Sequence, residues 1–243
     1  MQKTCTVRQN LRTCHCDMLS TWRPSAILES MQDASGHHCD ILGIGRDDLR
    51  SRGLVWVVNR YELVMDSYPH FGDTVLVETF PLPTRHGFYP RYYAFHGEDG
   101  QEYGYGCGLW SVLDLDKRAM VSGPLLADSL PDNRDLQAKL KMPALARGLD
   151  GEPECDAFLP RFTDLDDNRH VNNTKYMDWC VNALGIETMS QSTFSHLIIN
   201  YHREIRPGQQ VCTELRREGE HFSYAGFANG ETHFAISGEM RKR

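Results

Sequence analysis

The chain has 243 residues, of which 40% are hydrophobic and 24% are charged, and its formal net charge is −7 at pH 7. This composition is typical of a globular protein, and the acidic balance argues against nucleic-acid binding, which needs a basic surface. No apolar run approaches the roughly 18 residues that span a membrane, and the first residues resemble neither a signal peptide nor a transit peptide. We therefore expect a cytoplasmic protein without an integral membrane segment.

Eight cysteines are scattered along the chain. A disulfide scaffold is not expected in a chain long enough to build a hydrophobic core. The segments Cys14-His15-Cys16 and His37-His38-Cys39 could together form a zinc site. However, Cys-x-Cys lacks the usual two-residue ligand spacing. We expect buried reduced thiols, with no metal and no cofactor.

In the first half, a helix is expected to begin at Pro24, because proline suits the opening turn. Side chains then recur at helical spacing at Ile27, Met31, Ala34 and His38. Gly43 and Gly45 end this pattern. Strand-like runs follow at residues 54–65, 73–80, 88–97 and 102–115. We expect a further strand before the helix.

The second half repeats this order. Asn172 or Asn173 can cap a helix, because a short side-chain oxygen accepts from an unpaired backbone N–H. The apolar stripe of that helix consists of Tyr176, Trp179, Cys180, Ala183 and Leu184. Gly185 ends the helix. Strand-like runs follow at residues 194–205, 210–219, 221–229 and 232–240.

A shared G-x-x-V-x-[VT]-E pattern links the two halves. Gly72 and Glu78 correspond to Gly208 and Glu214 at a constant offset of 136 residues. We interpret the chain as a duplicated α+β unit, each half a long central helix wrapped by an antiparallel sheet. The predicted division is an N-terminal half at 1–125, a connector at 126–153 and a C-terminal half at 154–243.

A dense polar cluster, "TDLDDNRHVNNTKYMDW" at residues 163–179, precedes only the second helix. His170 could transfer protons near neutral pH, and the amide of Asn168 could orient a water or a carbonyl group. Asp166 could hold a neighbour in place. These groups suit the attack of water on a carbonyl, while the alternative is an Asx-rich turn with an incidental histidine.

This cluster closely resembles the D-x-N-x-H-V-N-N-x-x-Y signature of acyl-acyl-carrier-protein thioesterases, a family with a double hotdog fold. Residues 56–80, with their W-V, Y-P and G-D positions, resemble the first-half segment of the family, and "NYHREIRPGQ" at 200–209 resembles its Y-x-R-E segment. The start of the chain favours a bacterial-type member. The resemblance implies a tandem hotdog fold and hydrolysis of fatty acyl groups from acyl carrier protein. It also implies that the first half supplies the acyl-chain pocket.

The signature places the functional residues of the family at Asp166, Asn168 and His170, and the Y-x-R-E segment adds Glu204. Some accounts of the plant enzymes put a nucleophilic cysteine directly after this acid, but Ile205 stands here. We therefore expect direct attack by water. The general base is Glu204 or His170, with the other residues positioning, and the sequence leaves this choice open. By residue types alone, Glu204 could equally form a surface ion pair with a neighbouring arginine.

Two other functions stay open: an acyl-CoA thioesterase of the same fold and a non-catalytic acyl-binding module. An enoyl hydratase is disfavoured, because its Asp and His are five residues apart and Leu165 occupies that position here. An acidic carrier protein would need a local basic patch on this acidic chain. The candidates are Lys139, Lys141 and Arg147, and the terminal Arg241, Lys242 and Arg243, which could equally form a solvated tail. A homodimer also stays open.

Overall fold

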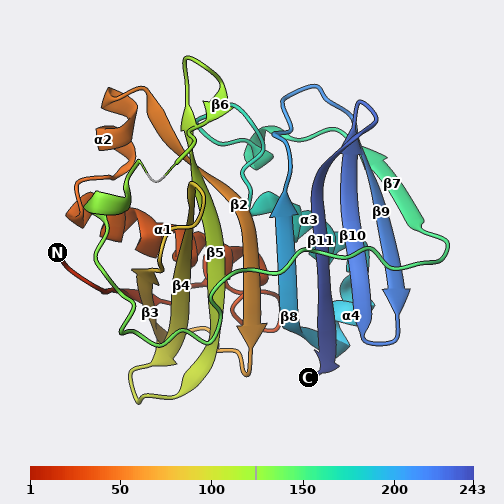
Figure 1. Ribbon diagram of the computed structural model, residues 1–243. Coiled ribbons are helices and arrows are strands. Elements are labelled where there is room, and N and C mark those ends of the chain that lie inside the picture. Colours follow the sequence, from red (N-terminus) through yellow and green to blue (C-terminus); the bar gives the residue numbers. More distant parts are fainter. Residues whose placement is uncertain (124) are drawn as a thin grey trace. The chain divides into compact units, whose positions relative to one another are not determined.

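The computed structural model describes residues 1–123 and 125–243 and divides into two compact units, Met1–Pro143 and Ala144–Arg243 (Figure 1). Each unit combines an antiparallel sheet with helices, which confirms the predicted α+β class. The predicted connector, 126–153, is shared between the two units. No helix in the described residues is both long and apolar enough to cross a membrane.

The first unit forms a sheet in the order β1-β3-β4-β5-β2, with the short β6 on β5. Its strands are β1 (Cys5–Asn10), β2 (Leu54–Met65), β3 (Thr74–Pro81), β4 (Phe88–Gly97), β5 (Glu102–Asp114) and β6 (Ala119–Met120). Its helices are α1 (Pro24–Ile41), α2 (Arg46–Ser51) and the 3-10 turns η1 (Thr13–His15) and η2 (Ala127–Ser129). The predicted helix start, the four strand-like runs and the further strand before the helix are thus all present.

Helix α1 packs against β1 and β3 with the side chains that the sequence pattern selects. Ile27, Met31, Ala34 and His38 are all buried. The Ser35 hydroxyl lies 2.6 Å from the Tyr93 hydroxyl on β4, which ties the helix to the sheet. This face of the sheet and α1 together form the core of the first unit.

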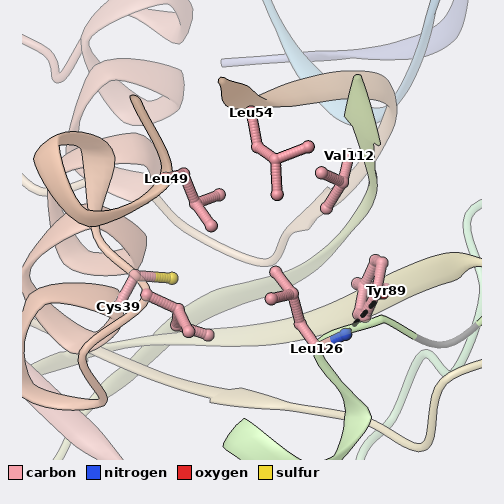
Figure 2. Close-up of a cluster of buried hydrophobic side chains, with 7 residues drawn as sticks. Cys39, Leu49, Leu54, Tyr89, Val112 and Leu126 are labelled. Carbon is pink, nitrogen blue, oxygen red and sulfur yellow. Dashed lines mark hydrogen bonds between the residues drawn. The ribbon is translucent and has the colours of Figure 1, made fainter. Parts of the chain in front are cut away.

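A hydrophobic cluster fixes the end of α1 and the following α2 in the first unit (Figure 2). Its buried members are Cys39, Ile44, Leu49, Leu54, Tyr89, Val112 and Leu126. The Tyr89 hydroxyl accepts a hydrogen bond from the Leu126 N–H at 3.1 Å, so its polar group is satisfied inside the cluster. Each such buried side chain contributes about 1.5–3 kcal/mol to stability.

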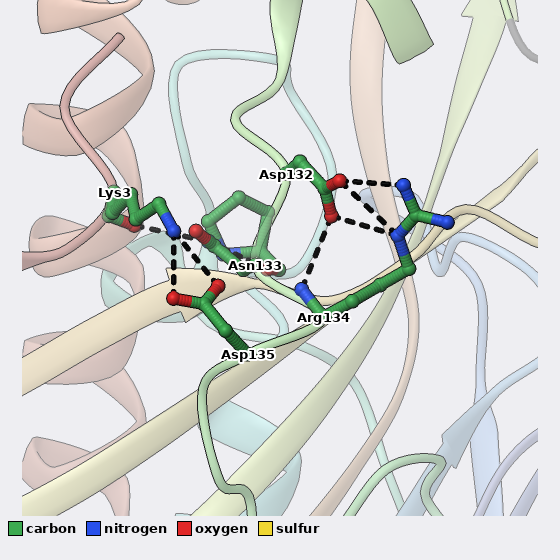
Figure 3. A network of polar contacts seen from close by, with 6 residues as sticks. Lys3, Asp132, Asn133, Arg134 and Asp135 are labelled. Atoms are coloured by element: carbon green, nitrogen blue, oxygen red, sulfur yellow. Dashed lines mark hydrogen bonds and ion pairs between the residues drawn. The ribbon is translucent and has the colours of Figure 1, made fainter.

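The predicted connector begins by crossing the other face of the first sheet (Figure 3). Asn133, buried at 3% exposure, donates hydrogen bonds to the backbone carbonyls of Lys3 and Pro81, both at 3.0 Å. Lys3 also forms an exposed ion pair with Asp135 at 2.8 Å. The Asn133 bonds provide most of the attachment, because exposed ion pairs contribute about 0–1 kcal/mol.

Apolar side chains of the connector continue this cover. Leu136, Ala138 and Leu140 pack against a buried cluster on the sheet. That cluster consists of Phe80, Leu82, Tyr92, Ala94 and Cys107. Tyr92 and Ala94 alternate along β4 with residues that face α1, so they point to the opposite face of the sheet. The connector therefore buries a surface that α1 cannot reach.

The second unit forms a sheet in the order β8-β11-β10-β9-β7. Its strands are β7 (Glu154–Phe158), β8 (Ser192–Tyr201), β9 (Val211–Glu218), β10 (His221–Ala228) and β11 (Glu231–Lys242). Its helices are η3 (Phe162–Asp164), α3 (Lys175–Leu184) and α4 (Ile186–Gln191). Gly185 ends α3 with a φ of 86°, a conformation that glycine adopts without strain.

Residues 144–151 lie across the sheet of the second unit. One side chain from each of four strands forms a hydrogen bond with the backbone of this segment. Backbone N–H groups of this segment donate to Asn200 of β8, Ser237 of β11 and Ser223 of β10, at 2.6, 3.1 and 3.0 Å. Arg216 of β9 donates to a backbone carbonyl of the segment at 3.0 Å. This part of the predicted connector is thus hydrogen-bonded to four strands of the sheet.

Three details differ from the sequence interpretation. Strand β8 ends at Tyr201, although the strand-like run continues to residue 205. The residue at the N-cap of α3 is Thr174, and the Asn172 side chain instead accepts from the Thr174 N–H just outside the helix, at 3.0 Å. The terminal segment is not a solvated tail, because β11 pairs with β8 as far as Lys242 and the Arg243 N–H donates to a carbonyl at the end of α4.

Candidate active site

The four predicted site residues all belong to the second unit and lie on two segments. Asp166, Asn168 and His170 lie in the loop between η3 and α3, and Glu204 lies in the segment that follows β8. The structure brings His170 into contact with both Asp166 and Glu204. It orders Asn168 through the same turn.

The first segment is a tight turn organised by Asp166. The Asp166 carboxylate accepts a hydrogen bond from the Asn168 N–H at 2.9 Å, and its carbonyl accepts from the Arg169 N–H at 3.0 Å. The Asp166 N–H donates to the His170 carbonyl at 2.9 Å, which closes the turn. Arg169 has a φ of 64°, in the left-handed region that a residue with a Cβ seldom occupies. The turn thus returns the chain so that His170 stands beside Asp166.

Both ring nitrogens of His170 face acceptor oxygens. Nδ1 lies 3.5 Å from Asp166 Oδ2 and 3.3 Å from the Val171 carbonyl oxygen. Nε2 lies 3.9 Å from Glu204 Oε1, which is longer than a hydrogen bond and makes this an electrostatic contact. The His170 side chain is 24% exposed and that of Glu204 is 51% exposed, so water and a substrate can reach the pair.

Backbone contacts fix the second segment beside the first. The Val171 N–H donates to the Ile205 carbonyl at 2.8 Å, and this bond joins the residues that directly follow His170 and Glu204. The other carboxylate oxygen of Glu204 accepts from Arg206 at 3.3 Å. The surface ion pair that the residue types allowed for Glu204 is therefore present, and the contact with His170 exists alongside it.

No thiol takes the nucleophile position in this geometry. The Ile205 side chain, directly after Glu204, is fully buried. Cys180 is fully buried in α3, and burial raises the pKa of its thiol. Cys212 is exposed on β9. A buried thiol with a raised pKa is a poor nucleophile, so Cys180 does not suit covalent catalysis.

The described residues of the chain contain no cluster of three or more His, Cys, Asp or Glu side chains that could hold a metal ion. His15, one member of the zinc pattern considered from sequence, instead accepts from the Arg12 N–H at 3.0 Å. Cys39 belongs to the hydrophobic cluster of the first unit. These residues have structural contacts.

The first unit contains a turn with the same hydrogen bonds. The Asp17 carboxylate accepts from the Leu19 N–H at 2.9 Å, and its carbonyl accepts from the Ser20 N–H at 3.0 Å. The Asp17 N–H donates to the Thr21 carbonyl at 2.8 Å, and Ser20 has a φ of 62°. The backbone of the turn is therefore repeated before both helices.

The two turns differ in the side chains that could do chemistry. Leu19 takes the place of Asn168, and Thr21 takes the place of His170. The second turn thus carries an imidazole and an amide that the first turn lacks. The aspartate at the start is common to both turns, so its hydrogen bonds to the backbone serve the fold in each unit.

Sequence reasoning missed one contact of Glu204. His233 of β11 is 4% exposed, and its Nδ1 lies 3.0 Å from the Glu204 carbonyl oxygen. The two residues are 29 positions apart in the chain, so no local motif connects them. The strand itself gave no signal, because β11 also carries Thr232, Ser237 and Glu239.

One antiparallel sheet packed on a helix, repeated within the chain, defines the tandem hotdog-type class of α+β proteins. Solved structures share this fold. An acyl-ACP thioesterase from Bacteroides thetaiotaomicron has a TM-score of 0.88 at 19% identity, and the match covers 98% of both chains. The 12:0-ACP thioesterase from Umbellularia californica has a TM-score of 0.85 at 20% identity, and the match covers 99% of this chain and 98% of the other.

The chain belongs to the acyl-ACP thioesterase family. Residues 3–124 match the family model for the acyl-ACP thioesterase N-terminal domain, and residues 149–242 match that for the C-terminal domain. A palmitoyl-acyl carrier protein thioesterase from Gossypium hirsutum is 25% identical over 201 residues, which cover 73% of this chain and 46% of that protein. The chain thus spans about half the length of the curated relatives that it matches.

Proposed function

We propose that the second unit hydrolyses the thioester between a fatty acyl group and acyl carrier protein and so releases a free fatty acid. The observation that carries the proposal is the contact of His170 with two carboxylates, Asp166 and Glu204, in a chain of the acyl-ACP thioesterase family. The names of the relatives support the substrate class. The cytoplasmic setting expected from the sequence belongs to the same proposal.

The proposed chemistry begins with a water molecule that attacks the thioester carbonyl carbon while the Glu204 carboxylate takes its proton. Asn168 positions the carbonyl or the water, and the tetrahedral oxyanion forms. The carbon–sulfur bond then breaks, and His170 gives a proton to the departing thiolate. Glu204 returns its proton to His170, so the products are a fatty acid and the free thiol of the carrier. A general base of this kind contributes about 10²–10⁴-fold to the rate.

The choice of Glu204 as base rests on its access to water. Its carboxylate is 51% exposed, whereas the His170 side chain is 24% exposed and its Nδ1 lies 3.3 Å from the Val171 carbonyl oxygen. In this proposal His170 supplies the proton to the departing thiolate. Asp166, held by the backbone of its own turn, orients His170 for this role.

The proposal includes acyl carrier protein as partner, docked through a local basic patch. Within the first candidate patch, Lys139 is already paired with Glu102 at 2.6 Å and lies 5.0 Å from the ring centroid of Tyr105. The second patch lies on the ordered end of β11, where Lys242 is exposed. Both patches remain candidates for the docking surface.

The test measures release of free thiol from acyl carrier protein loaded with acyl chains of several lengths, with the matching acyl-CoA thioesters alongside. Glu204→Gln and His170→Gln are expected to lower turnover by about 10²-fold or more. Asp166→Asn and Asp17→Asn form a matched pair, because each alters the same turn but only Asp166 contacts His170. Turnover should fall in the first variant and persist in the second.

The outcomes separate the alternatives. Cleavage of acyl-CoA alone would indicate the CoA thioesterase. A well-folded wild type that hydrolyses no thioester, yet binds acyl groups, would indicate the non-catalytic binding module. Equal loss in the Asp166→Asn and Asp17→Asn variants would contradict a site confined to the second unit.

A further inference from the structure

The segment that carries Glu204 is shaped by an irregularity in the neighbouring strand. In the pairing of β10 with β11, Gly226 lies opposite Phe234 and Phe227 lies opposite Thr232, which leaves His233 as an extra residue on β11. Such β-bulges bend a strand and redirect the side chain and carbonyl of the extra residue. Here the bulge on β11 lies beside the end of β8 at Tyr201, and Glu204 follows shortly after in the chain.

His233 makes three hydrogen bonds to the segment that follows β8. Its carbonyl accepts from the N–H groups of His202 and Arg203 at 2.8 and 3.1 Å. Its Nδ1 lies 3.0 Å from the Glu204 carbonyl oxygen, and because a carbonyl only accepts, Nδ1 carries the proton. The His233 side chain is almost completely buried, so this bond is shielded from water.

The first unit repeats the backbone part of this arrangement. On β5, Phe95 lies opposite Gly104 and His96 opposite Glu102, so Tyr103 is the extra residue. The Tyr103 carbonyl accepts from two successive N–H groups after β2, at 2.8 and 3.1 Å. The bulge and its carbonyl bonds therefore belong to the fold of both units.

The side chain at the bulge is what differs between the units. The residue that corresponds to Glu204 at the offset of 136 is Tyr68, and the residue at the bulge is Tyr103 instead of His233. The bond from an imidazole to the segment's carbonyl is thus found in the unit whose segment carries a carboxylate, Glu204. The fold of the first unit forms the same bulge with a phenol in place of the imidazole.

We propose that His233 is a positioning residue that holds the Glu204 carboxylate against His170; this rests on the proposed function. The His233 carbonyl holds the start of this segment at His202 and Arg203, and any residue at the bulge can make those bonds. Glu204 and Ile205 are held by two further bonds, the Ile205 carbonyl to the Val171 N–H and the Glu204 carbonyl to the His233 ring. Loss of the bond to the His233 ring lets the carboxylate shift along its segment. A misplacement of about 1 Å in a reacting group can cost on the order of 100-fold in rate.

The test compares His233→Leu, which removes the donor, with His233→Asn, whose amide nitrogen can occupy the position of Nδ1. His233→Leu is expected to lower kcat on the order of 100-fold with little change in KM, and His233→Asn should recover most of that loss. The control is His221→Leu, because His221 is an exposed histidine at the start of β10 in the same sheet. Its kcat should match that of the wild type.

A double-mutant cycle shows whether His233 acts through Glu204. In a Glu204→Gln background, His233→Leu should cost almost nothing further, because the group that it positions is already lost. An equal loss of kcat in both backgrounds would overturn the proposal. So would a His233→Leu variant with the kcat of the wild type, or a His233→Asn variant as impaired as His233→Leu with an unchanged melting temperature.

Hydrogen exchange at the Val171 amide provides a readout that does not depend on activity. This N–H bridges the two segments, so its exchange should accelerate in His233→Leu and stay slow in His233→Asn. Exchange that stays slow in both variants would contradict the positioning role. A wild type without thioesterase activity would refute the proposed function alone, and the exchange measurement would still test the contact.

Discussion

His38 lies fully buried on α1, between Arg91 and the backbone of Gln2. Arg91 can only donate, so His38 Nδ1 accepts from the guanidinium at 3.0 Å, and Nε2–H donates to the Gln2 carbonyl at 3.1 Å. This arrangement requires the neutral ring. Burial, followed by the positive charge of Arg91, lowers the pKa of His38 from 6.5 to about 4.

The lowered pKa predicts how stability depends on pH. As pH falls below 6.5, the unfolded chain takes up a proton at His38 before the folded chain does, so the free energy of unfolding decreases. The loss starts near pH 6.5 and is complete below about pH 4. The full difference corresponds to about 3 kcal/mol, and about 2 kcal/mol of it is lost between pH 7.5 and pH 5.

The assay is urea unfolding of the wild type and of His38→Gln at pH 7.5 and pH 5. Glutamine does not titrate, yet it can accept from Arg91 and donate to the Gln2 carbonyl. Tryptophan fluorescence reports mainly on the first unit, which contains Trp22, Trp56 and Trp110, three of the four tryptophans. The stability lost between the two pH values should be about 2 kcal/mol smaller in His38→Gln.

The neighbouring His37→Gln is the matched control, because His37 is exposed. Other titrating groups act equally in all three proteins and cancel in the comparison. His37→Gln should lose as much stability as the wild type between the two pH values. If His38→Gln also loses that same amount, the buried neutral imidazole does not determine the acid sensitivity and the reasoning fails.

Three further predictions concern the second unit. Iodoacetamide should leave thioester hydrolysis unchanged even when all exposed cysteines are labelled, because Cys180 is buried and the proposed nucleophile is water. Loss of activity in parallel with the loss of unlabelled cysteine would contradict this. Gly226→Ala should lower the free energy of unfolding by about 1–3 kcal/mol in urea titrations, because the added Cβ meets the Phe234 ring; unchanged stability would refute the close contact. Arg169→Gly should change stability by less than about 1 kcal/mol while Arg169→Val destabilises by more, because a φ of 64° is unfavourable for a residue with a Cβ and most unfavourable for a β-branched one; equal melting temperatures would argue against the strained turn.

Most element boundaries could be predicted from the sequence because their signals are local. The strand-like runs at 54–65 and 88–97 coincide with β2 and β4, since both are rich in β-branched and aromatic residues and are followed by turn residues. The end of β8 could not be predicted in this way. The apolar pattern continues to Ile205, but the carbonyl of the bulge at His233 turns the chain out of the sheet after Tyr201.

In the candidate site, too, the residues close together in the chain could be predicted, and those brought together by long-range contacts could not. Asp166, Asn168 and His170 lie within five residues, and the residue types alone suggested a site. Glu204 was selected only through the family resemblance, because its approach to His170 depends on contacts between segments that are distant in the chain. His233 was missed, since neither its spacing nor its neighbours in the chain indicate that it reaches the Glu204 carbonyl.

The repeated turn was also invisible in the sequence, for a physical reason. Its hydrogen bonds need an aspartate at the first position and one residue that tolerates a positive φ, and they otherwise involve only backbone groups. The segments "DMLSTW" and "DDNRHV" therefore form one backbone structure with little identity. Sequence comparison within the chain registers the strand pattern at Gly72 and Gly208 but not this turn.

The duplication separates what the fold requires from what the chemistry requires. Both units form the aspartate turn, the bulge and the backbone bond between the two segments, since the Trp22 N–H donates to the Pro69 carbonyl as Val171 does to Ile205. The second unit adds Asn168, His170, Glu204 and His233, where the first has Leu19, Thr21, Tyr68 and Tyr103. If these four polar residues served the fold, the first unit would need them as well. All four differ between two units that share these backbone bonds, which supports the proposal that they work as one site. Replacing Thr21 with histidine alone should therefore create no second site, because the carboxylate and the residue proposed to position it would still be absent from the first unit.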